Sequence, residues 1–576
     1  GQKKTTNAGS DGYWRVELDP MEANADGESL IVRSGENTVE LEDLVVGEVW
    51  IAAGQSNMNA GGPDKDTGVY PFYESPDNAD SLPDVRTRYF GYGASLEPQA
   101  DVPDIFQKDD ARWVTIDFDS GKSQNPARYF ARILRDRLEV PVGIIHVAVS
   151  GINQTAWLSR GSLESFPGKG DYANAYEQFF AEREARLSKN KGEIRSWADF
   201  KEVEEKWMMD PQGRWPGRGM TYVSYPTALY NTRIVPLAPY AIRGVIWHQG
   251  EAGPRNGYDQ RLVAMFQQWR ELFGQDFYVI WGTLSKDTGN QPPLEPSWTS
   301  FYRDANNSRI RNALNLFGDD PKVEYVEFYD LGNDDTHFTQ KAEAGRRMGL
   351  AGLEVAYGID TLYTGPRLID QKFDGDKVYL KFSHVGEGLV YEPSIDGISG
   401  FVISGPDGQA EWAEVRLINE DTIECSHPSV PDPVFLVYGK AENPHETLFN
   451  SDGIPATTFY LNESGITLKK SDQANKIVSF ESNPAKGSLH LQHVRRDGYI
   501  FELRKNKKRY DLSVARAWVP DEWEGVEVLQ AGQPVAFESF EEDGRKYVRF
   551  ELKVNSPPIV VANQGHAEEF LGIDRF

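Results

Sequence analysis

The sequence predicts an α/β fold, in which a parallel β-sheet is covered by helices on both faces and is followed by β-rich units. Two observations lead to this prediction. Between residues 47 and 358, continuous apolar strands are separated by amphipathic helical segments. From about residue 359 the helical periodicity disappears, and short strands with tight turns take its place. Because 576 residues exceed what one hydrophobic core supports, we expect several domains.

The N-terminal segment, residues 1–46, consists of short alternating runs broken by Gly, Asn and Asp, as in "SLIVRSG" and "NTVELEDL". It resembles a β-domain entered partway, so we expect a mature or trimmed chain. No signal peptide is recognisable, and for a trimmed chain this says little about secretion.

The strands of the parallel sheet are expected where apolar residues run on without alternation, because such strands are buried on both faces. These runs are 48–53, 142–149, 242–248, 277–284 and 323–330.

Amphipathic helices are expected between these strands. The segments "NPARYFARILRDRL" and "YDQRLVAMFQQWRELF" each place apolar residues on one face. An Ala/Gly-rich helix is expected after the strand at 323–330. The charged stretch 171–208 indicates a helical insertion, which either walls the site or is a solvated hairpin.

Two β-rich units are expected after the α/β domain at 47–358. Residues 359–461 have the pattern of a β-sandwich, and residues 462–576 form a second β-rich unit. The sequence shows neither repeats of 20–50 residues nor low-complexity segments.

Composition excludes several classes of partner. The net charge of −27 argues against nucleic acid, and no stretch approaches the roughly 18 apolar residues that span a bilayer. Cys425 is the single cysteine, so a disulfide framework and a cysteine metal site are excluded. We expect Cys425 to be buried in a strand. Neither a metal nor another cofactor is expected, since metal-binding motifs are absent and the acids are scattered.

Polar clusters follow four of the predicted strands, at the edge where open parallel sheets bind ligands. The clusters are Gly54-Gln55-Ser56-Asn57, Ser150-Gly151-Ile152-Asn153, Gln249-Gly250-Glu251, and the segment "LGNDDTHFTQKAEAG" after 323–330. Four such clusters together favour a site over ordinary turns.

The chemistry that these residue types support is acyl transfer. A serine hydroxyl needs a base, usually a histidine oriented by a carboxylate, and Ser56 is the candidate nucleophile. Six of the nine histidines lie in the C-terminal β region. Of the others, His146 is expected in the core and His248 could touch substrate. His337, with Asp334 and Asp335 just upstream, is the best candidate base.

A tetrahedral intermediate also needs hydrogen-bond donors for its oxyanion. The candidates are the backbone N–H groups of Ser56 and Gly151 and the side-chain amide of Gln249. Gly151 could equally be a plain turn glycine.

Three motifs, in this order and spacing, resemble the sialate O-acetylesterase-like branch of the SGNH hydrolases. They are "GEVWIAAGQSNM", "LYNTRIVPLAPYAIRGVIWHQGE" and "DDTHFTQKAEAGRRMGLAGLEVAYG", within a likeness covering roughly residues 12–461. The resemblance implies a flavodoxin-like three-layer α/β/α fold and a serine esterase that removes acetyl groups from sugars. It also implies that residues 47–358 are the catalytic domain.

Carried over by motif, the resemblance makes Ser56 the nucleophile, His337 the base, and Gly151 and Gln249 oxyanion donors. The triad acid is Asp334 by the wider superfamily's Asp-x-x-His spacing and Asp335 by the Asp-x-His of close relatives, which we prefer.

This sequence departs from the branch at two further places. Ser150-Gly151-Ile152 replaces the usual Gly-Gly-Thr, and His248 replaces a frequent Tyr. Expected substrate contacts are His248, Glu251 and Trp157, although Trp157 could be a core residue. Trp215, in the insertion, is a weaker candidate.

We therefore expect a carbohydrate O-acetylesterase that is secreted or periplasmic and acts in polysaccharide breakdown, with an acetylated carbohydrate as its partner. Two alternatives stay open: an inactive glycan-binding protein on the same scaffold, and an esterase for a small non-sugar ester. The sequence does not identify the sugar, the hydroxyl or the oligomeric state.

Overall fold

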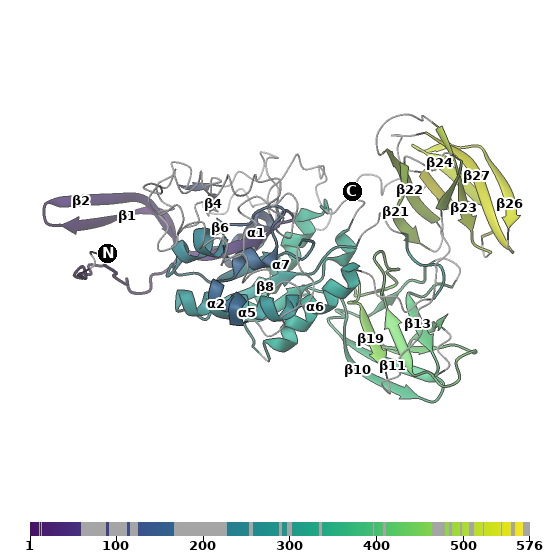
Figure 1. Ribbon diagram of the computed structural model, residues 1–576, viewed down its shortest axis with the longest axis horizontal. Coiled ribbons are helices and arrows are strands. Elements are labelled where there is room, and N and C mark those ends of the chain that lie inside the picture. Colours follow the sequence, from purple (N-terminus) through teal and green to yellow (C-terminus); the bar gives the residue numbers. More distant parts are fainter. Residues whose placement is uncertain are drawn as a thin grey trace, which may run out of the picture.

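The computed structural model shows an α/β unit with a long hairpin at one end and β-rich units at the other (Figure 1). It describes residues 1–10, 12, 14–58, 88–91, 112–115, 125–165, 227, 229–252, 257–286, 291–296, 302–318, 320–332, 337–394, 397–406, 410–462, 478–482, 487–495, 498–505, 512–521, 523–542, 544–553 and 559–567. The expected insertion at 171–208 and Trp215 lie outside these residues.

The α/β unit is built on a seven-stranded sheet of order β5-β4-β6-β3-β7-β8-β9. All neighbouring pairs are parallel except β4 with β5. The strands are β3 (Glu48–Gly54), β4 (Arg88–Gly91), β5 (Arg112–Thr115), β6 (Val142–His146), β7 (Gly244–His248), β8 (Tyr278–Gly282) and β9 (Val323–Val326). The predicted α/β class is confirmed, and β4 and β5 are strands that the sequence reading missed.

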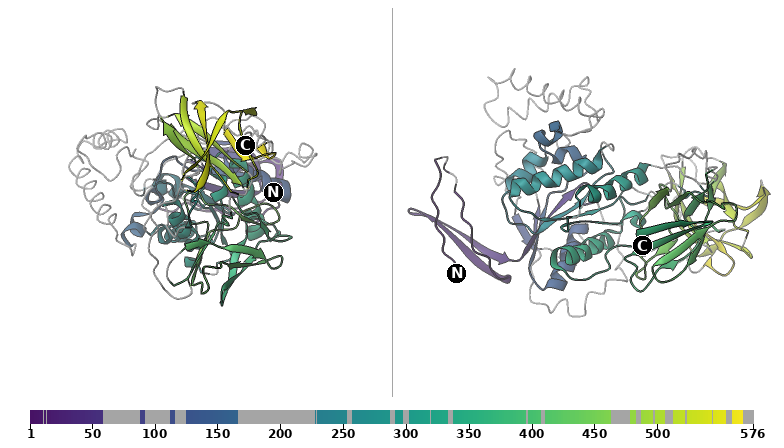
Figure 2. Two further views of the ribbon diagram at one scale, coloured as in Figure 1. Left: turned by 90° about the vertical axis from the view of Figure 1, so that its right-hand side faces the viewer. Right: turned by 90° about the horizontal axis from the view of Figure 1, so that it is seen from below.

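Helices cover both faces of this sheet (Figure 2). Alternate residues of β3 enter different cores, because successive side chains of a strand point to opposite faces. Trp50 packs with α1 (Pro126–Leu138) and α7 (Lys341–Tyr357). Ile51 belongs to the core that contains α5 (Tyr258–Phe273) and α6 (Tyr302–Leu316).

The small residues of α7 have a packing reason. A Cβ on Gly345 would lie 2.4 Å from the carbonyl oxygen of Pro126, and one on Gly349 would lie 2.7 Å from Cβ of Ile133. Glycine at these positions lets α7 lie directly against α1. The start of α7 is thereby held over the sheet.

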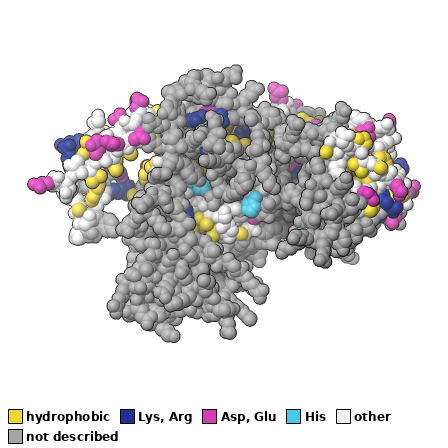
Figure 3. Space-filling view, turned by 90° about the horizontal axis from the view of Figure 1, so that it is seen from above, with side chains coloured by type: hydrophobic (Ala, Val, Ile, Leu, Met, Phe, Trp, Pro, Cys, Tyr) yellow, Lys and Arg dark blue, Asp and Glu magenta, His cyan; other side chains and the backbone are white. Residues whose placement is uncertain are grey.

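The N-terminal hairpin consists of β1 (Asn24–Ser34) and β2 (Asn37–Val46), paired antiparallel. It projects from the α/β unit, and hydrophobic and acidic side chains lie together on its surface (Figure 3). Val39 and Leu41 are 56% and 47% exposed.

Beyond residue 366 the strands form antiparallel sheets. One group has the orders β10-β11-β16-β15, β14-β13-β17-β19 and β12-β18, and the second has β20-β23-β27-β26 and β21-β22-β28-β24-β25. In the first group the strands are β10 (Arg367–Asp374), β11 (Lys377–Ser383), β12 (Val390–Tyr391), β13 (Phe401–Ser404), β14 (Ala410–Trp412), β15 (Glu414–Leu417), β16 (Thr422–Ser426), β17 (Phe435–Tyr438), β18 (Leu448–Phe449) and β19 (Phe459–Asn462). In the second they are β20 (Val478–Ser482), β21 (Gly487–Arg495), β22 (Gly498–Lys505), β23 (Leu512–Val519), β24 (Val526–Gln530), β25 (Gln533–Pro534), β26 (Phe537–Glu542), β27 (Arg545–Lys553) and β28 (Ile559–Asn563). The division at 46, 358 and 461 stays a prediction.

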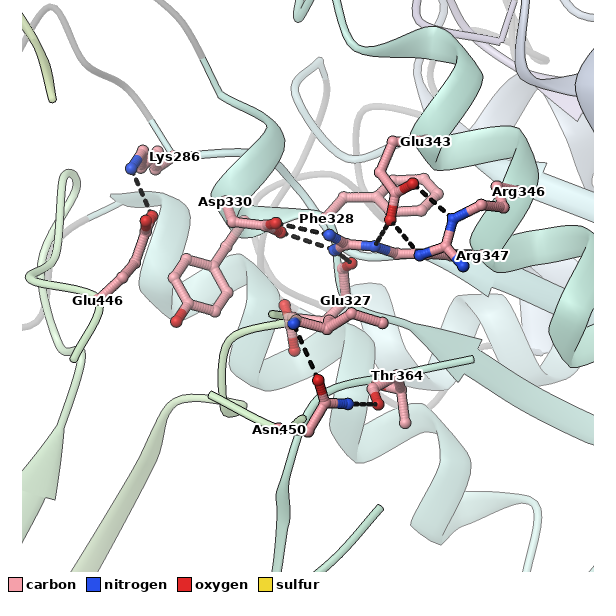
Figure 4. Close-up of polar contacts among 12 residues, drawn as sticks. Lys286, Glu327, Phe328, Asp330, Glu343, Arg346, Arg347, Thr364, Glu446 and Asn450 are labelled. Atoms are coloured by element: carbon pink, nitrogen blue, oxygen red, sulfur yellow. Dashed lines mark hydrogen bonds and ion pairs between the residues drawn. The ribbon is translucent and has the colours of Figure 1, made fainter. Parts of the chain in front are cut away.

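The first β-rich group contacts loops at the carboxyl edge of the parallel sheet. The Tyr329 hydroxyl donates to the carbonyl oxygen of Ala456 at 3.0 Å, and Lys286 pairs with Glu446 (Figure 4). Cys425 is buried in β16, as expected. No helix in the described part of the chain is both long and apolar enough to cross a bilayer.

Candidate active site

Ser56 lies in a tight turn directly after β3. The turn begins at Gly54, whose φ of +134° favours glycine, and where a Cβ would lie 2.1 Å from the carbonyl oxygen of His248. The Gln55 amide donates to that same oxygen at 3.0 Å, and the Met58 amide donates to the Gln55 carbonyl at 2.9 Å. Ser56 is half-buried, and no hydrogen-bond partner for its hydroxyl is found among the described residues.

The two amide side chains that flank Ser56 are held by one carboxylate. Gln55 Nε2 donates to Glu251 Oε2, and Asn57 Nδ2 donates to Glu251 Oε1, both at 2.6 Å. The side chains of Gln55 and Asn57 are almost completely buried. The turn is therefore rigid on both sides of the serine.

The loop with Gly151 lies beside this turn. The Val149 amide donates to the Gly54 carbonyl at 3.1 Å, which brings the end of the β6 segment to the end of β3. Gly151 is exposed, with a φ of +72°. Within the described residues, the backbone N–H groups of Ser56 and Gly151 have no acceptor.

The segment with His337 is anchored to the end of β7 through Phe338 and to the Ser56 turn through Lys341. Phe338 packs edge-on against His248, with ring centroids 5.7 Å apart. Lys341 Nζ lies 2.6 Å from Asn57 Oδ1 and 3.2 Å from the Asn57 carbonyl oxygen. His337 itself is exposed. Both candidate acids, Asp334 and Asp335, lie outside the described residues.

Gln249 was expected to offer a free donor to the oxyanion, but its side-chain amide nitrogen already faces three acceptors. Its amide nitrogen lies 3.1 Å from Gln55 Oε1, 3.0 Å from the Ile152 carbonyl oxygen and 2.6 Å from that of Ala252. Two hydrogens thus face three acceptors, and an oxyanion would have to replace one of them. In this structure Gln249 ties the Gly151 loop to the Ser56 turn.

His248 and Glu251, the other expected substrate contacts, have buried side chains that contact each other, and Glu251 also binds the Ser56 turn. The His248 side chain is fully buried, with Nε2 3.1 Å from Glu251 Oε1 and Nδ1 3.3 Å from the Gly282 carbonyl oxygen. The Glu251 side chain is 6% exposed. Burial alone would raise the pKa of Glu251, but the neighbouring His248 and Asn57 side chains hold this pKa at about 2.

Trp157 is a core residue in this structure, which is the second of the two roles that the sequence left open for it. It is fully buried and packs edge-on against Trp247, with centroids 5.5 Å apart. His146 is also a core residue, as predicted, with Nε2 2.9 Å from the Met58 carbonyl oxygen. Burial lowers the pKa of His146 to about 4.

A buried arginine supports the base of the loop between β9 and α7. The Arg347 guanidinium makes two hydrogen bonds to Asp330, at 2.7 and 2.6 Å, and one to Glu343 at 2.8 Å (Figure 4). Asp330 and Arg347 bracket the segment that carries His337. This pairing ties the chain just after β9 to the second turn of α7.

The sequence reading missed Lys341 and the roles of the two amides. Lys341 lies in the first turn of α7, where a cation is opposed by the helix dipole, and its side chain is largely buried. A basic residue in the first turn of an otherwise Ala/Gly-rich helix was the available signal. Among the described residues, no group of three side chains of metal-ligating type occurs.

Comparison with known proteins finds similarity to proteins named as esterases. The chain is 24% identical over 287 residues to a protein named sialate O-acetylesterase from Rattus norvegicus, a match covering 47% of this chain and 48% of that protein. The Homo sapiens protein of that name is 22% identical, over 45% of this chain and 43% of its own. The chain thus spans about half the length of the curated relatives it matches. No family model matches.

A solved structure described as a carbohydrate acetylesterase from Xanthomonas citri aligns with a TM-score of 0.57 and 25% identity, covering 79% of this chain and 89% of the other. This similarity extends over more of the chain than the curated sequence matches do.

Proposed function

Because this chain is a homologue of sialate O-acetylesterases and of a carbohydrate acetylesterase, we propose that it removes acetyl groups from sugars by a serine acyl-enzyme mechanism. The α/β unit would be an SGNH hydrolase domain, and the β-rich groups accessory domains of sandwich type. The observation that carries the proposal is the Ser56 turn, held rigidly beside two backbone N–H groups that have no described partner.

In the proposed reaction, Ser56 Oγ attacks the acetyl carbonyl carbon while His337 takes the hydroxyl proton, oriented by Asp335 or Asp334. The backbone N–H groups of Ser56 and Gly151 donate to the oxyanion of the tetrahedral intermediate. His337 then gives its proton to the departing sugar oxygen, which leaves as a hydroxyl while Ser56 stays acetylated. Water, deprotonated by His337, attacks the acetyl carbonyl carbon, and His337 returns the proton to Ser56 Oγ as the ester bond breaks and acetate leaves.

The proposed substrate is an acetylated glycan or polysaccharide, and the proposed location is secreted or periplasmic. The name sialate O-acetylesterase belongs to the curated relatives, and it does not make sialic acid the substrate here. The −27 net charge suits a substrate that is not a strong polyanion.

The test is acetate release from acetylated xylan, pectin, algal polysaccharides, O-acetyl sialic acid and a chromogenic acetate ester, comparing wild type with Ser56→Ala. We expect the variant to lose roughly 10³-fold or more in kcat while staying folded. Ser383→Ala, at a half-buried serine in β11, is the matched control and should keep full activity.

An undiminished rate in Ser56→Ala would overturn the mechanism. A wild type that releases acetate from none of these substrates, but binds one of the glycans, would point to the inactive glycan-binding alternative. Activity confined to the chromogenic ester would favour a small non-sugar ester.

A further inference from the structure

One carboxylate joins the three segments that carry the proposed reaction. We propose that Glu251 is a positioning residue: it holds both flanks of Ser56 and, through Gln55 and Gln249, fixes the loop that carries Gly151. This inference rests on the proposed esterase function, and it gives Glu251 a role that does not involve touching substrate.

Glu251 binds the residues on both sides of the nucleophile. Glu251 Oε2 accepts from Gln55 Nε2, and Oε1 accepts from Asn57 Nδ2, both at 2.6 Å. An ionised carboxylate has acceptors only, so both amides must turn their nitrogen toward it. His248, 3.1 Å away on the third side, holds the carboxylate in place.

Gln55 connects Glu251 to the Gly151 loop through Gln249. Since Gln55 directs its nitrogen to Glu251, its Oε1 points away and accepts from Gln249 Nε2 at 3.1 Å. The same nitrogen faces the Ile152 carbonyl oxygen at 3.0 Å, one residue after Gly151. Gln249 Oε1 is buried with no partner among the described residues.

This orientation of Gln249 is enforced by its neighbours. Reversing the amide would set its oxygen against the oxygens of Gln55, Ile152 and Ala252, which now lie within 3.1 Å of the nitrogen. Glu251 thus directs Gln55, and Gln55 together with the Ile152 and Ala252 carbonyls directs Gln249, so that a relay of amides runs from the Ser56 turn to the Gly151 loop.

Asn57 connects Glu251 to the segment that carries His337. Asn57 directs its Nδ2 to Glu251, and its Oδ1 therefore accepts from Lys341 Nζ at 2.6 Å. Lys341 lies at the start of α7, four residues after His337. Loss of the carboxylate should therefore disturb the relative positions of Ser56, Gly151 and His337 together.

The test is Glu251→Gln, whose carboxamide would place an NH₂ group against Gln55 or Asn57, donor facing donor. With a chromogenic acetate ester, we expect kcat to fall about 10- to 100-fold and KM to stay within about twofold, because alignment of reacting groups is lost rather than substrate contact. The midpoints of the pH profile of kcat/KM should not move, because Glu251 transfers no proton.

The matched control is Glu424→Gln in β16. Glu424 is also a nearly buried carboxylate, paired with Lys377 and Arg416, but it lies in a β-rich sheet. This variant should keep kcat and KM. Thermal unfolding of each variant shows whether it is folded at the assay temperature.

A second variant, Gln55→Leu, interrupts the relay while leaving the carboxylate with Asn57 and His248. We expect a comparable fall in kcat for this variant. The kcat of the double variant Glu251→Gln/Gln55→Leu should be no more than about threefold below that of the less active single variant, because both changes break the same relay. If Glu251→Gln does not fold, Gln55→Leu alone decides, and an unchanged kcat there overturns the proposal.

Other outcomes are equally informative. A raised KM with unchanged kcat in Glu251→Gln would mean a substrate contact, and a shifted pH midpoint would mean proton transfer, and either overturns the positioning role. Unchanged kcat in Glu251→Gln with active wild type overturns this inference alone. A wild type without esterase activity overturns the proposed function, and this inference with it.

Discussion

Replacing Gly54 with alanine should damage both stability and activity, because the strand end at β3 leaves no room for a side chain. A Cβ there would lie 2.1 Å from the His248 carbonyl oxygen and 2.9 Å from its carbonyl carbon. Both are backbone atoms of the neighbouring strand, so they cannot turn aside. The φ of +134° adds a conformation that residues with a side chain rarely adopt.

The expected magnitude follows from these contacts. Strained backbone costs about 1–3 kcal/mol. The clash also separates the strand ends joined by Gln55 N–H to the His248 oxygen (3.0 Å) and Val149 N–H to the Gly54 oxygen (3.1 Å). At about 1 kcal/mol for each hydrogen bond, the α/β unit should lose about 3–5 kcal/mol. A shift of Ser56 by about 1 Å should lower kcat by about 10²-fold.

The loss of unfolding free energy is measured by urea unfolding followed by tryptophan fluorescence. This signal reports on the α/β unit because five tryptophans are fully buried there: Trp50, Trp157, Trp247, Trp269 and Trp281. The fall in kcat is measured by acetate release. Gly375→Ala is the control: its φ is +61°, but a Cβ there meets nothing within 4 Å, so about 1–2 kcal/mol and no activity should be lost. A Gly54→Ala protein with the wild-type urea midpoint and kcat would refute the reasoning.

Two further predictions concern buried side chains outside the reaction. Trp157→Phe should lower the free energy of unfolding by about 1–2 kcal/mol through lost core contacts, and KM for an acetylated glycan should not change. A tenfold rise in KM would instead indicate that Trp157 contacts the sugar. Burial raises the pKa of the Cys425 thiol, so iodoacetamide at pH 8 should modify it only after unfolding in denaturant; rapid modification of the native protein would contradict its place in the core.

Several features could be predicted from the sequence because they depend on local pattern. Unbroken apolar runs identified five strands of the parallel sheet, and the segment 258–273 matched α5 to the residue. The polar clusters after these runs placed Ser56, Gly151 and Gln249 at one edge, since the carboxyl ends of parallel strands meet there.

The same pattern does not tell which way a side chain points. Trp157, His248 and Glu251 were expected near this edge as substrate contacts, with a core position also open for Trp157, and in the structure the side chains of Trp157 and His248 are fully buried and that of Glu251 nearly so. Whether a side chain near a strand end points outward or into the core depends on neighbours distant in sequence, such as Trp247 for Trp157 and Phe338 for His248. A residue type and its spacing carry no information on that choice.

The sequence by itself determined the order of elements, the chemistry available at the sheet edge and the candidate nucleophile. Only the tertiary structure decided why Ser56 stands between two amides: each amide reaches Glu251, almost 200 residues away in the chain, and Asn57 also binds Lys341. The physical reason is that an amide has a donor end and an acceptor end. Which end faces which neighbour is settled only when the folded chain brings a carboxylate and an ammonium group to either side.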